Sequence, residues 1–63
     1  MDLVSQLREM RSRALTDARA FLALYEEALT DERYLAADAY REQRSFAEGR
    51  AHALDSILAL VAP

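Results

Sequence analysis

Apolar side chains recur along this chain at spacings of three, four and seven residues, which is the repeat of one face of a helix. The repeat changes register around residues 30–32, where Thr30, Asp31 and Glu32 follow one another. We therefore expect two long helices, at about 2–29 and about 33–61, joined by a turn at about 30–32. The repeating positions are Val4, Leu7, Ala14, Ala18, Phe21, Tyr25 and Ala28, then Ala37, Tyr40, Ala47, Ala51, Leu54, Leu58 and Val61.

Very few residues in the chain oppose helix formation. Gly49 is the only glycine, the only proline is the last residue, and there is no asparagine. Two long helices with one short connection run antiparallel. The sequence thus predicts an all-α fold, an antiparallel helical hairpin that forms a single domain over residues 1–63.

The turn itself has one candidate signal. Thr30 is suited to cap the second helix, and Asp31 and Glu32 would place negative charge at the positive end of its dipole. The tetrapeptide Ala-Leu-Thr-Asp also occurs at 14–17, so an alternative is that Thr16 caps too and splits the first helix. We favour an intact first helix because the apolar repeat passes residue 16 in phase. A single unbroken helix is the other alternative, and the change of register argues against it.

In such a hairpin, residues whose numbers sum to about 61 lie at the same level. This pairing opposes Leu7 with Leu54, Ala14 with Ala47, and Phe21 with Tyr40. Large side chains then meet towards both ends and small ones in the middle, where two helices can approach closely. Gly49 indicates either close approach of another backbone or simple tolerance, because glycine inside a helix costs about 1 kcal/mol relative to alanine.

Each helix carries more apolar surface than one neighbour can cover. A chain of 63 residues without cysteine has a marginal core and no disulfide to support it. We therefore expect a homodimer in which two hairpins form a four-helix bundle. The alternative is a monomer whose extra stripe stays free for a different protein. The expected dimer or partner contacts are Leu35, Phe46, Ala53 and Leu60 on the second helix and Leu15 and Leu22 on the first.

Several polar residues fall inside the apolar arcs, chiefly Arg11, Gln43 and Arg50, with Arg44 at the edge of the second-helix stripe. We predict that Arg11, Gln43 and Arg50 form a buried polar layer, with Arg11 and Arg50 at one level. Buried guanidinium groups need compensating charge. One interpretation pairs them with Glu9, Glu48 or an acid of the partner chain. The other is that they accept an acidic side chain or phosphate of a binding partner.

Composition narrows the function. The net charge is −3 and neither half of the chain is basic, so nucleic-acid binding is not favoured. No signal peptide is recognisable, and the longest apolar run, 57–62, is far below the roughly 18 residues of a membrane span. We expect a cytoplasmic protein.

One group of residues superficially resembles a metal or acid–base site. Glu48, His52 and Asp55 lie close in sequence, but they project onto a polar sector typical of a solvated salt-bridge face. One glycine cannot build a phosphate-binding loop. We expect no catalytic residue, no metal and no cofactor, and hence no enzyme.

Residues 21–44 resemble the UVR helical-hairpin motif of nucleotide-excision-repair proteins. The resemblance implies a hairpin that recognises another hairpin, although Asp38 and Arg44 depart from the motif, which has alanine and isoleucine there. The small RNA-binding hairpin dimers of the Rop type are similar in architecture only. The matching positions are Tyr25, Ala28, Tyr34, Ala37, Tyr40, Arg41 and Glu42.

These features together favour a small non-catalytic protein–protein interaction module, an adaptor, regulator or inhibitor, that acts as a helical-hairpin homodimer. Its expected partners are a second copy of itself and another protein. Two alternatives stay open: a nucleic-acid-binding regulator of the hairpin-dimer type, and a UVR-like hairpin partner of a repair protein.

Overall fold

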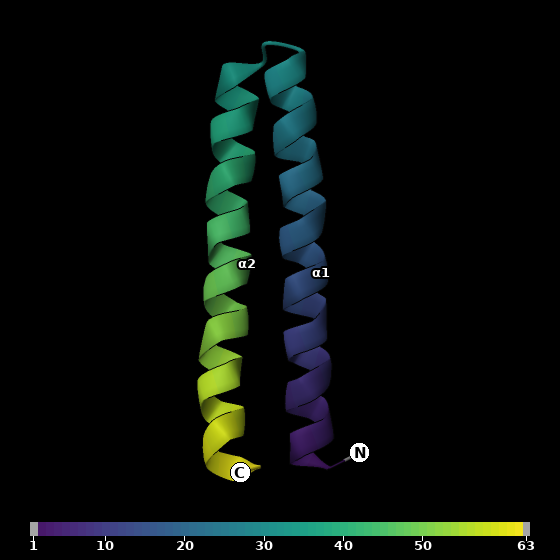
Figure 1. The fold of residues 1–63 in the computed structure, drawn as a ribbon, viewed down its shortest axis with the longest axis vertical. Coiled ribbons are helices and arrows are strands. Elements are labelled where there is room, and N and C mark those ends of the chain that lie inside the picture. Colours follow the sequence, from purple (N-terminus) through teal and green to yellow (C-terminus); the bar gives the residue numbers. More distant parts are fainter. Residues whose placement is uncertain (1, 63) are drawn as a thin grey trace.

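The computed structural model describes residues 2–62 as two helices, α1 (Leu3–Thr30) and α2 (Tyr34–Val61), which pack side by side and antiparallel (Figure 1). The predicted all-α helical hairpin is therefore confirmed. Met1 and Pro63, the ends of the predicted domain, lie outside the described residues. Helix α1 continues through Thr16 without a break, and the turn after Thr30 excludes a single long helix. The molecule is an elongated rod of 44 × 17 × 12 Å.

A side-chain cap begins α1. Asp2 has an extended backbone, and its Oδ1 accepts a hydrogen bond of 2.7 Å from the backbone N–H of Ser5. This bond satisfies one of the N–H groups that a helix leaves free at its first turn. The same bond lowers the pKa of the Asp2 carboxyl from its ordinary value of 3.8. Sequence reasoning had not identified Asp2 as a cap.

The turn between the helices is a Schellman motif. The Arg33 N–H donates to the Ala28 carbonyl at 2.8 Å, and the Glu32 N–H donates to the Leu29 carbonyl at 3.1 Å. These bonds satisfy carbonyls that the end of α1 would otherwise leave free. The motif requires a left-handed residue, and Glu32 supplies it with φ of 58°. Glycine normally takes this position, because a side chain there costs about 1 kcal/mol.

The predicted capping role of Thr30 is wrong. Thr30 is the last residue of α1, and its hydroxyl donates to the Glu26 carbonyl at 3.0 Å, inside the helix it ends. The N-cap of α2 is Arg33, which makes no side-chain capping bond. A threonine directly after an apolar repeat can end one helix or begin the next. Here the backbone hydrogen bonds of the turn make Thr30 the last residue of α1.

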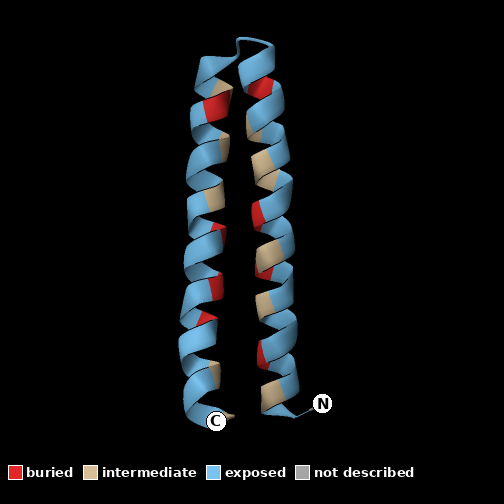
Figure 2. Ribbon diagram, in the orientation of Figure 1, coloured by how far each residue is buried: buried red, intermediate tan, exposed pale blue. Residues whose placement is uncertain are grey.

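The hairpin has a thin core. Eight residues are buried, six of them alanines, and among residues 2–62 no large side chain is fully buried. Figure 2 shows this core as small patches along the line where the helices face each other, which we call the seam. Because a buried alanine removes little apolar area from water, the hairpin gains only modest stability from its own interior. The buried residues are Leu7, Ala14, Ala18 and Ala28 on α1 and Ala37, Ala47, Ala51 and Leu54 on α2.

The predicted position of Phe21 opposite Tyr40 is confirmed, and the two rings stack. Their ring centroids are 6.5 Å apart, with an interplanar angle of 29°, and both side chains are half-buried. Gly49 has open space where a Cβ would stand, with no atom within 4 Å. Within the hairpin, therefore, Gly49 is tolerated and no neighbouring backbone requires it.

Candidate protein-binding surface

Within residues 2–62, two ion pairs join α1 to α2, and they lie on opposite sides of the seam. One joins Arg50 Nη2 to Asp17 Oδ2 at 3.3 Å, and the other joins Arg11 Nε to Asp55 Oδ1. Viewed down the axis of α1, at 100° per residue, Arg11 and Asp17 lie about 120° apart. The buried stripe that includes Ala14 runs between them. The pairs thus mark two distinct faces of the hairpin.

The face that contains Asp17 and Arg50 carries most of the exposed large apolar side chains, and we call it the apolar face. Met10 lines a groove there together with both charged residues. Phe46 is 61% exposed and Leu60 is 83% exposed, although each is a large apolar side chain. The other residues of the apolar face are assigned by their helical spacing from Asp17 on α1 and from Arg50 on α2. The apolar face comprises Leu3, Met10 and Leu24 on α1 and Phe46, Ala53, Ile57 and Leu60 on α2. Leu35 lies instead on the outer side of α2, beside Asp38, Arg41 and Ser45.

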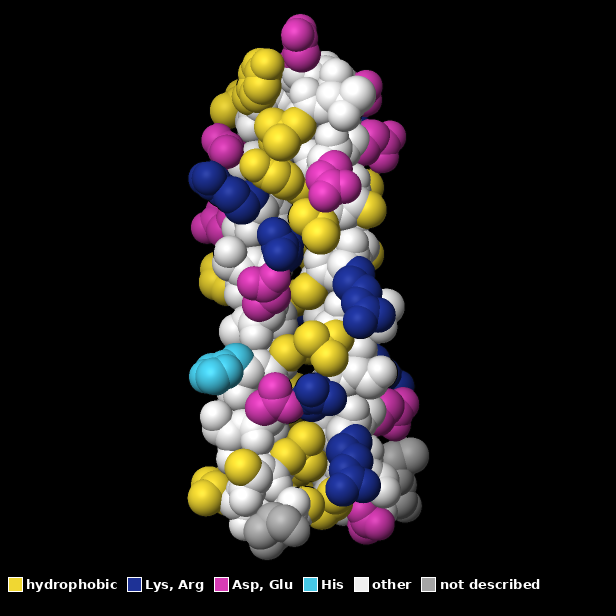
Figure 3. Space-filling view, viewed as in Figure 1, with side chains coloured by type: hydrophobic (Ala, Val, Ile, Leu, Met, Phe, Trp, Pro, Cys, Tyr) yellow, Lys and Arg dark blue, Asp and Glu magenta, His cyan; other side chains and the backbone are white. Residues whose placement is uncertain are grey.

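The opposite face is polar, and we call it the charged face. A groove on it is lined by side chains of both helices, with Leu15 and Leu22 at its base and Arg44 and Glu48 on one wall. Both leucines are half-buried. Arg44 Nε and Glu48 Oε1 form an ion pair of 2.9 Å beside them. Figure 3 shows this face, with hydrophobic side chains along the seam and arginine and acidic side chains next to them on both helices.

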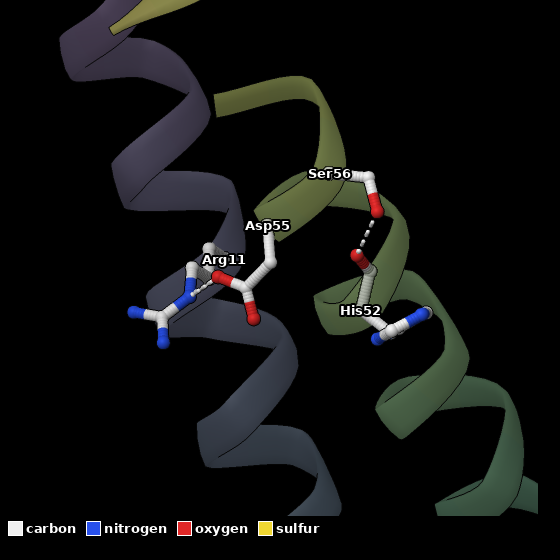
Figure 4. A network of polar contacts seen from close by, with 4 residues as sticks. All are labelled: Arg11, His52, Asp55 and Ser56. Carbon is white, nitrogen blue, oxygen red and sulfur yellow. Dashed lines mark hydrogen bonds and ion pairs between the residues drawn. The ribbon is translucent and has the colours of Figure 1, made fainter. Parts of the chain in front are cut away.

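The Arg11–Asp55 pair crosses the seam on the charged face (Figure 4). Arg11 extends from α1 and Asp55 from α2, and their charged groups meet between the helices. His52 points away from this pair, and its backbone carbonyl accepts a hydrogen bond of 3.3 Å from the Ser56 hydroxyl. The histidine is therefore not part of an acid–base pair with Asp55.

The predicted buried polar layer does not form within the hairpin. Gln43 and Arg50 are exposed, Arg11 is only half-buried, and no polar or charged residue among 2–62 is buried. Arg11 and Arg50 also lie on opposite faces, so they do not share one site. Burial of any of the three therefore stays a prediction for an assembly larger than one hairpin.

The predicted ion-pair partners are also corrected. Glu9 pairs with Arg13 at 2.6 Å and Glu48 pairs with Arg44, each within its own helix. Acids of the facing helix neutralise Arg11 and Arg50 instead. Helical spacing suggests ion pairs within one helix. The packing of the two helices instead brings Asp55 to Arg11 and Asp17 to Arg50.

The structure separates the predicted contact residues into three groups. Phe46, Ala53 and Leu60 lie exposed on the apolar face, and Leu15 and Leu22 lie half-buried on the charged face. Leu35 is exposed on the outer side of α2, beside Asp38 and Arg41. These six residues do not form one surface. Four further members of the apolar face, Leu3, Met10, Leu24 and Ile57, were not among the predicted contacts, although the spacing of seven from Leu3 to Met10 and of fourteen from Met10 to Leu24 signals a shared face.

No group of three or more His, Asp or Glu side chains within residues 2–62 is placed to hold a metal ion. Neither helix, over the same residues, is long and apolar enough to cross a membrane. The candidate functional surfaces are accordingly the two faces of the hairpin.

Comparison with known proteins gives no family for the chain. No family model, no curated protein and no solved structure matches it. The resemblance of residues 21–44 to the UVR motif therefore remains a resemblance of pattern, and any function has to be argued from the two faces themselves.

Proposed function

We propose that the protein is a non-catalytic protein–protein interaction module that acts as a helical-hairpin homodimer. The observation that carries this proposal is the mismatch between the interior and the surface. The interior holds two leucines and six alanines, while ten large apolar side chains among residues 2–62 are exposed. A stable small domain normally buries its largest apolar side chains, so this hairpin gains more from association than from its own core.

The charged face supports the second half of the proposal, docking onto another protein. Its groove combines a base formed by Leu15 and Leu22 with guanidinium groups of Arg19 and Arg44 at the edges. Apolar area surrounded by arginine is typical of protein interfaces, whose centres are depleted in lysine and enriched in arginine. A homodimer formed through the apolar face leaves this groove open to solvent.

Sedimentation equilibrium of the purified full chain over a range of concentrations tests the proposal directly. We expect the mass of a dimer that dissociates on dilution, and a monomer at every concentration would contradict the homodimer. A mobility-shift assay at low salt tests the nucleic-acid alternative in parallel. Tight, salt-sensitive binding to RNA or DNA would replace the proposed function, because a chain of net charge −3 offers little general attraction to phosphate.

A partner-capture experiment tests the docking half. Immobilised wild-type chain is compared with Leu22→Glu, which places a charge in the groove of the charged face, and with Phe46→Glu as the variant of the apolar face. We expect a partner retained by wild type to be lost by Leu22→Glu even where that variant still dimerises. A protein captured equally by wild type and Leu22→Glu would contradict docking through this groove.

A further inference from the structure

We infer that a second copy of the chain packs on the apolar face with its turn at the same end of the dimer, so that Asp17 of each copy lies against the partner subunit's Arg50. This inference rests on the proposed homodimer and specifies its interface and its arrangement. It also assigns a role to the ion pair that joins α1 to α2 on this face, in a groove that Arg13 lines as well.

The apolar face has the size of a specific interface. The hairpin measures 44 Å along the helices and 17 Å across them. A face of these dimensions covers on the order of 700 Å², close to the roughly 800 Å² that each partner buries in a standard interface. An identical copy offers a surface of the same length and the same apolar character, and a two-fold dimer is the commonest way to pair such surfaces.

The ion pair lies near the middle of this face. Asp17 is at the midpoint of α1 (Leu3–Thr30), and Arg50 lies about 4 Å from the midpoint of α2 at 1.5 Å per residue. Their side chains are 51% and 61% exposed, so each has free surface that can contact a second molecule. Any face-to-face dimer centred on the apolar face therefore brings two such pairs together.

Two arrangements are possible when two identical faces meet about a two-fold axis. If the axis is parallel to the helices, both turns lie at one end and each α1 packs on the partner's α2. If the axis crosses the helices, the turns lie at opposite ends and each α1 packs on the partner's α1. Neighbouring helices are antiparallel in both cases, so helix direction does not separate them.

The charges of Asp17 and Arg50 distinguish the two arrangements. With the turns at opposite ends, Asp17 faces the partner subunit's Asp17, and two carboxylates meet in the middle of an apolar interface. With the turns at the same end, Asp17 faces the partner subunit's Arg50 and four charges alternate in sign. Because ions that lose water need opposite charge beside them, the same-end arrangement is the favoured one.

A distance measurement between the two turns tests the arrangement. The chain has no cysteine, so Glu32→Cys in the exposed turn gives a single site for a spin label. In the same-end dimer we expect a label-to-label distance of about 20 Å, set by helix spacings of about 10 Å and the length of the labels. A distance near the 44 Å length of the hairpin would overturn the same-end arrangement while leaving the homodimer intact. A monomer in sedimentation with no dipolar signal would instead overturn the homodimer itself.

The direction in which one substitution changes the dimer dissociation constant tests the role of the ion pair. Asp17→Asn keeps the size of the side chain and removes its charge. We expect the dimer dissociation constant to rise about fivefold, because the attraction to the partner subunit's Arg50 is lost. A lowered or unchanged constant would overturn the inference, because the same-end arrangement places each Asp17 against an arginine of both copies. Asp55→Asn removes the corresponding acid of the charged face, and as the matched control it should leave the constant unchanged.

Discussion

The two faces of the hairpin share one seam and one kind of ion pair across it, yet they expose very different amounts of apolar surface. On the charged face Leu15 and Leu22 are half-buried, although neither points directly at the facing helix. On the apolar face Phe46 is 61% exposed and Leu60 is 83% exposed. Leu29, seven residues after Leu22, is 41% exposed. The comparison shows that the leucines in the middle of the charged face are better covered than the large apolar side chains of the apolar face.

The reason for the difference lies in the residues next to the leucines. On the charged face Arg19 and Arg44 line the same groove as Leu15 and Leu22. Arginine can lay its aliphatic stem along apolar surface while its guanidinium stays in water. On the apolar face Phe46 and Leu60 stay largely exposed, and the two central charges, Asp17 and Arg50, pair with each other. Association is therefore the remaining way to remove that surface from water.

The largest expected change in the dimer dissociation constant comes from introducing a charge on the apolar face, compared with the same change on the charged face. Phe46→Glu should raise the dimer dissociation constant by about 100-fold, or about 2.7 kcal/mol, because an aromatic side chain near the centre of an interface contributes most to binding. Phe46 is 61% exposed in the hairpin, so the substitution should leave helix content unchanged in circular dichroism. Sedimentation equilibrium gives the constant.

Leu22→Glu is the matched control on the charged face. It should change the dimer dissociation constant by less than threefold, since the proposed interface does not include that face. If Leu22→Glu dissociates the dimer and Phe46→Glu does not, the roles of the two faces are reversed. If both variants lose helix content, the apolar surface stabilises the single hairpin rather than an assembly.

The fold of this chain follows from its sequence in most respects because its signals are local and repeated. The register change near residue 31 locates the turn, and the sum rule pairs Phe21 with Tyr40 correctly. The details of the turn could not be predicted. No glycine or asparagine marks the left-handed position, and Glu32 takes it only because the Schellman bonds from Glu32 and Arg33 favour this closure of α1.

The candidate surfaces were harder to predict, because each depends on how the two helices face each other. Helical projection places Leu15 and Phe46 each beside a core stripe of its own helix. It does not say that the hairpin turns these residues to opposite sides. The ion pairs that mark the sides join residues 33 and 44 positions apart in sequence, beyond the reach of any helical repeat.

A smaller effect, on the free energy of unfolding, shows whether the stability of the hairpin is independent of which face forms the dimer. Glu32→Gly should raise the free energy of unfolding by about 1 kcal/mol, because glycine adopts the left-handed conformation of the turn without steric cost. Thermal unfolding at fixed protein concentration measures the gain. The preference for the apolar face should not change, since the turn lies outside it.

Ser12→Gly is the control for this substitution, because Ser12 is exposed within α1. Glycine there should lower the free energy of unfolding by about 0.5 kcal/mol. A loss of stability in Glu32→Gly as well would mean that the turn does not hold Glu32 in the left-handed region. An altered dimer dissociation constant at equal helix content would instead place the turn in the interface.

The smallest effect concerns the N-terminal end of the apolar face, where Asp2 caps the helix that begins with Leu3. The hydrogen bond from the Ser5 N–H holds the pKa of Asp2 below 3.8, so the cap contributes fully at pH values above that value. Its contribution is lost as the pH falls through the lowered pKa, because the protonated carboxyl accepts the bond less well. The backbone amide resonance of Ser5 should therefore titrate with a midpoint below 3.8, and Asp2→Asn, which keeps an acceptor without the charge, should abolish that titration. A midpoint at or above 3.8 would show that the cap does not hold in solution and that Leu3 is not fixed on the apolar face.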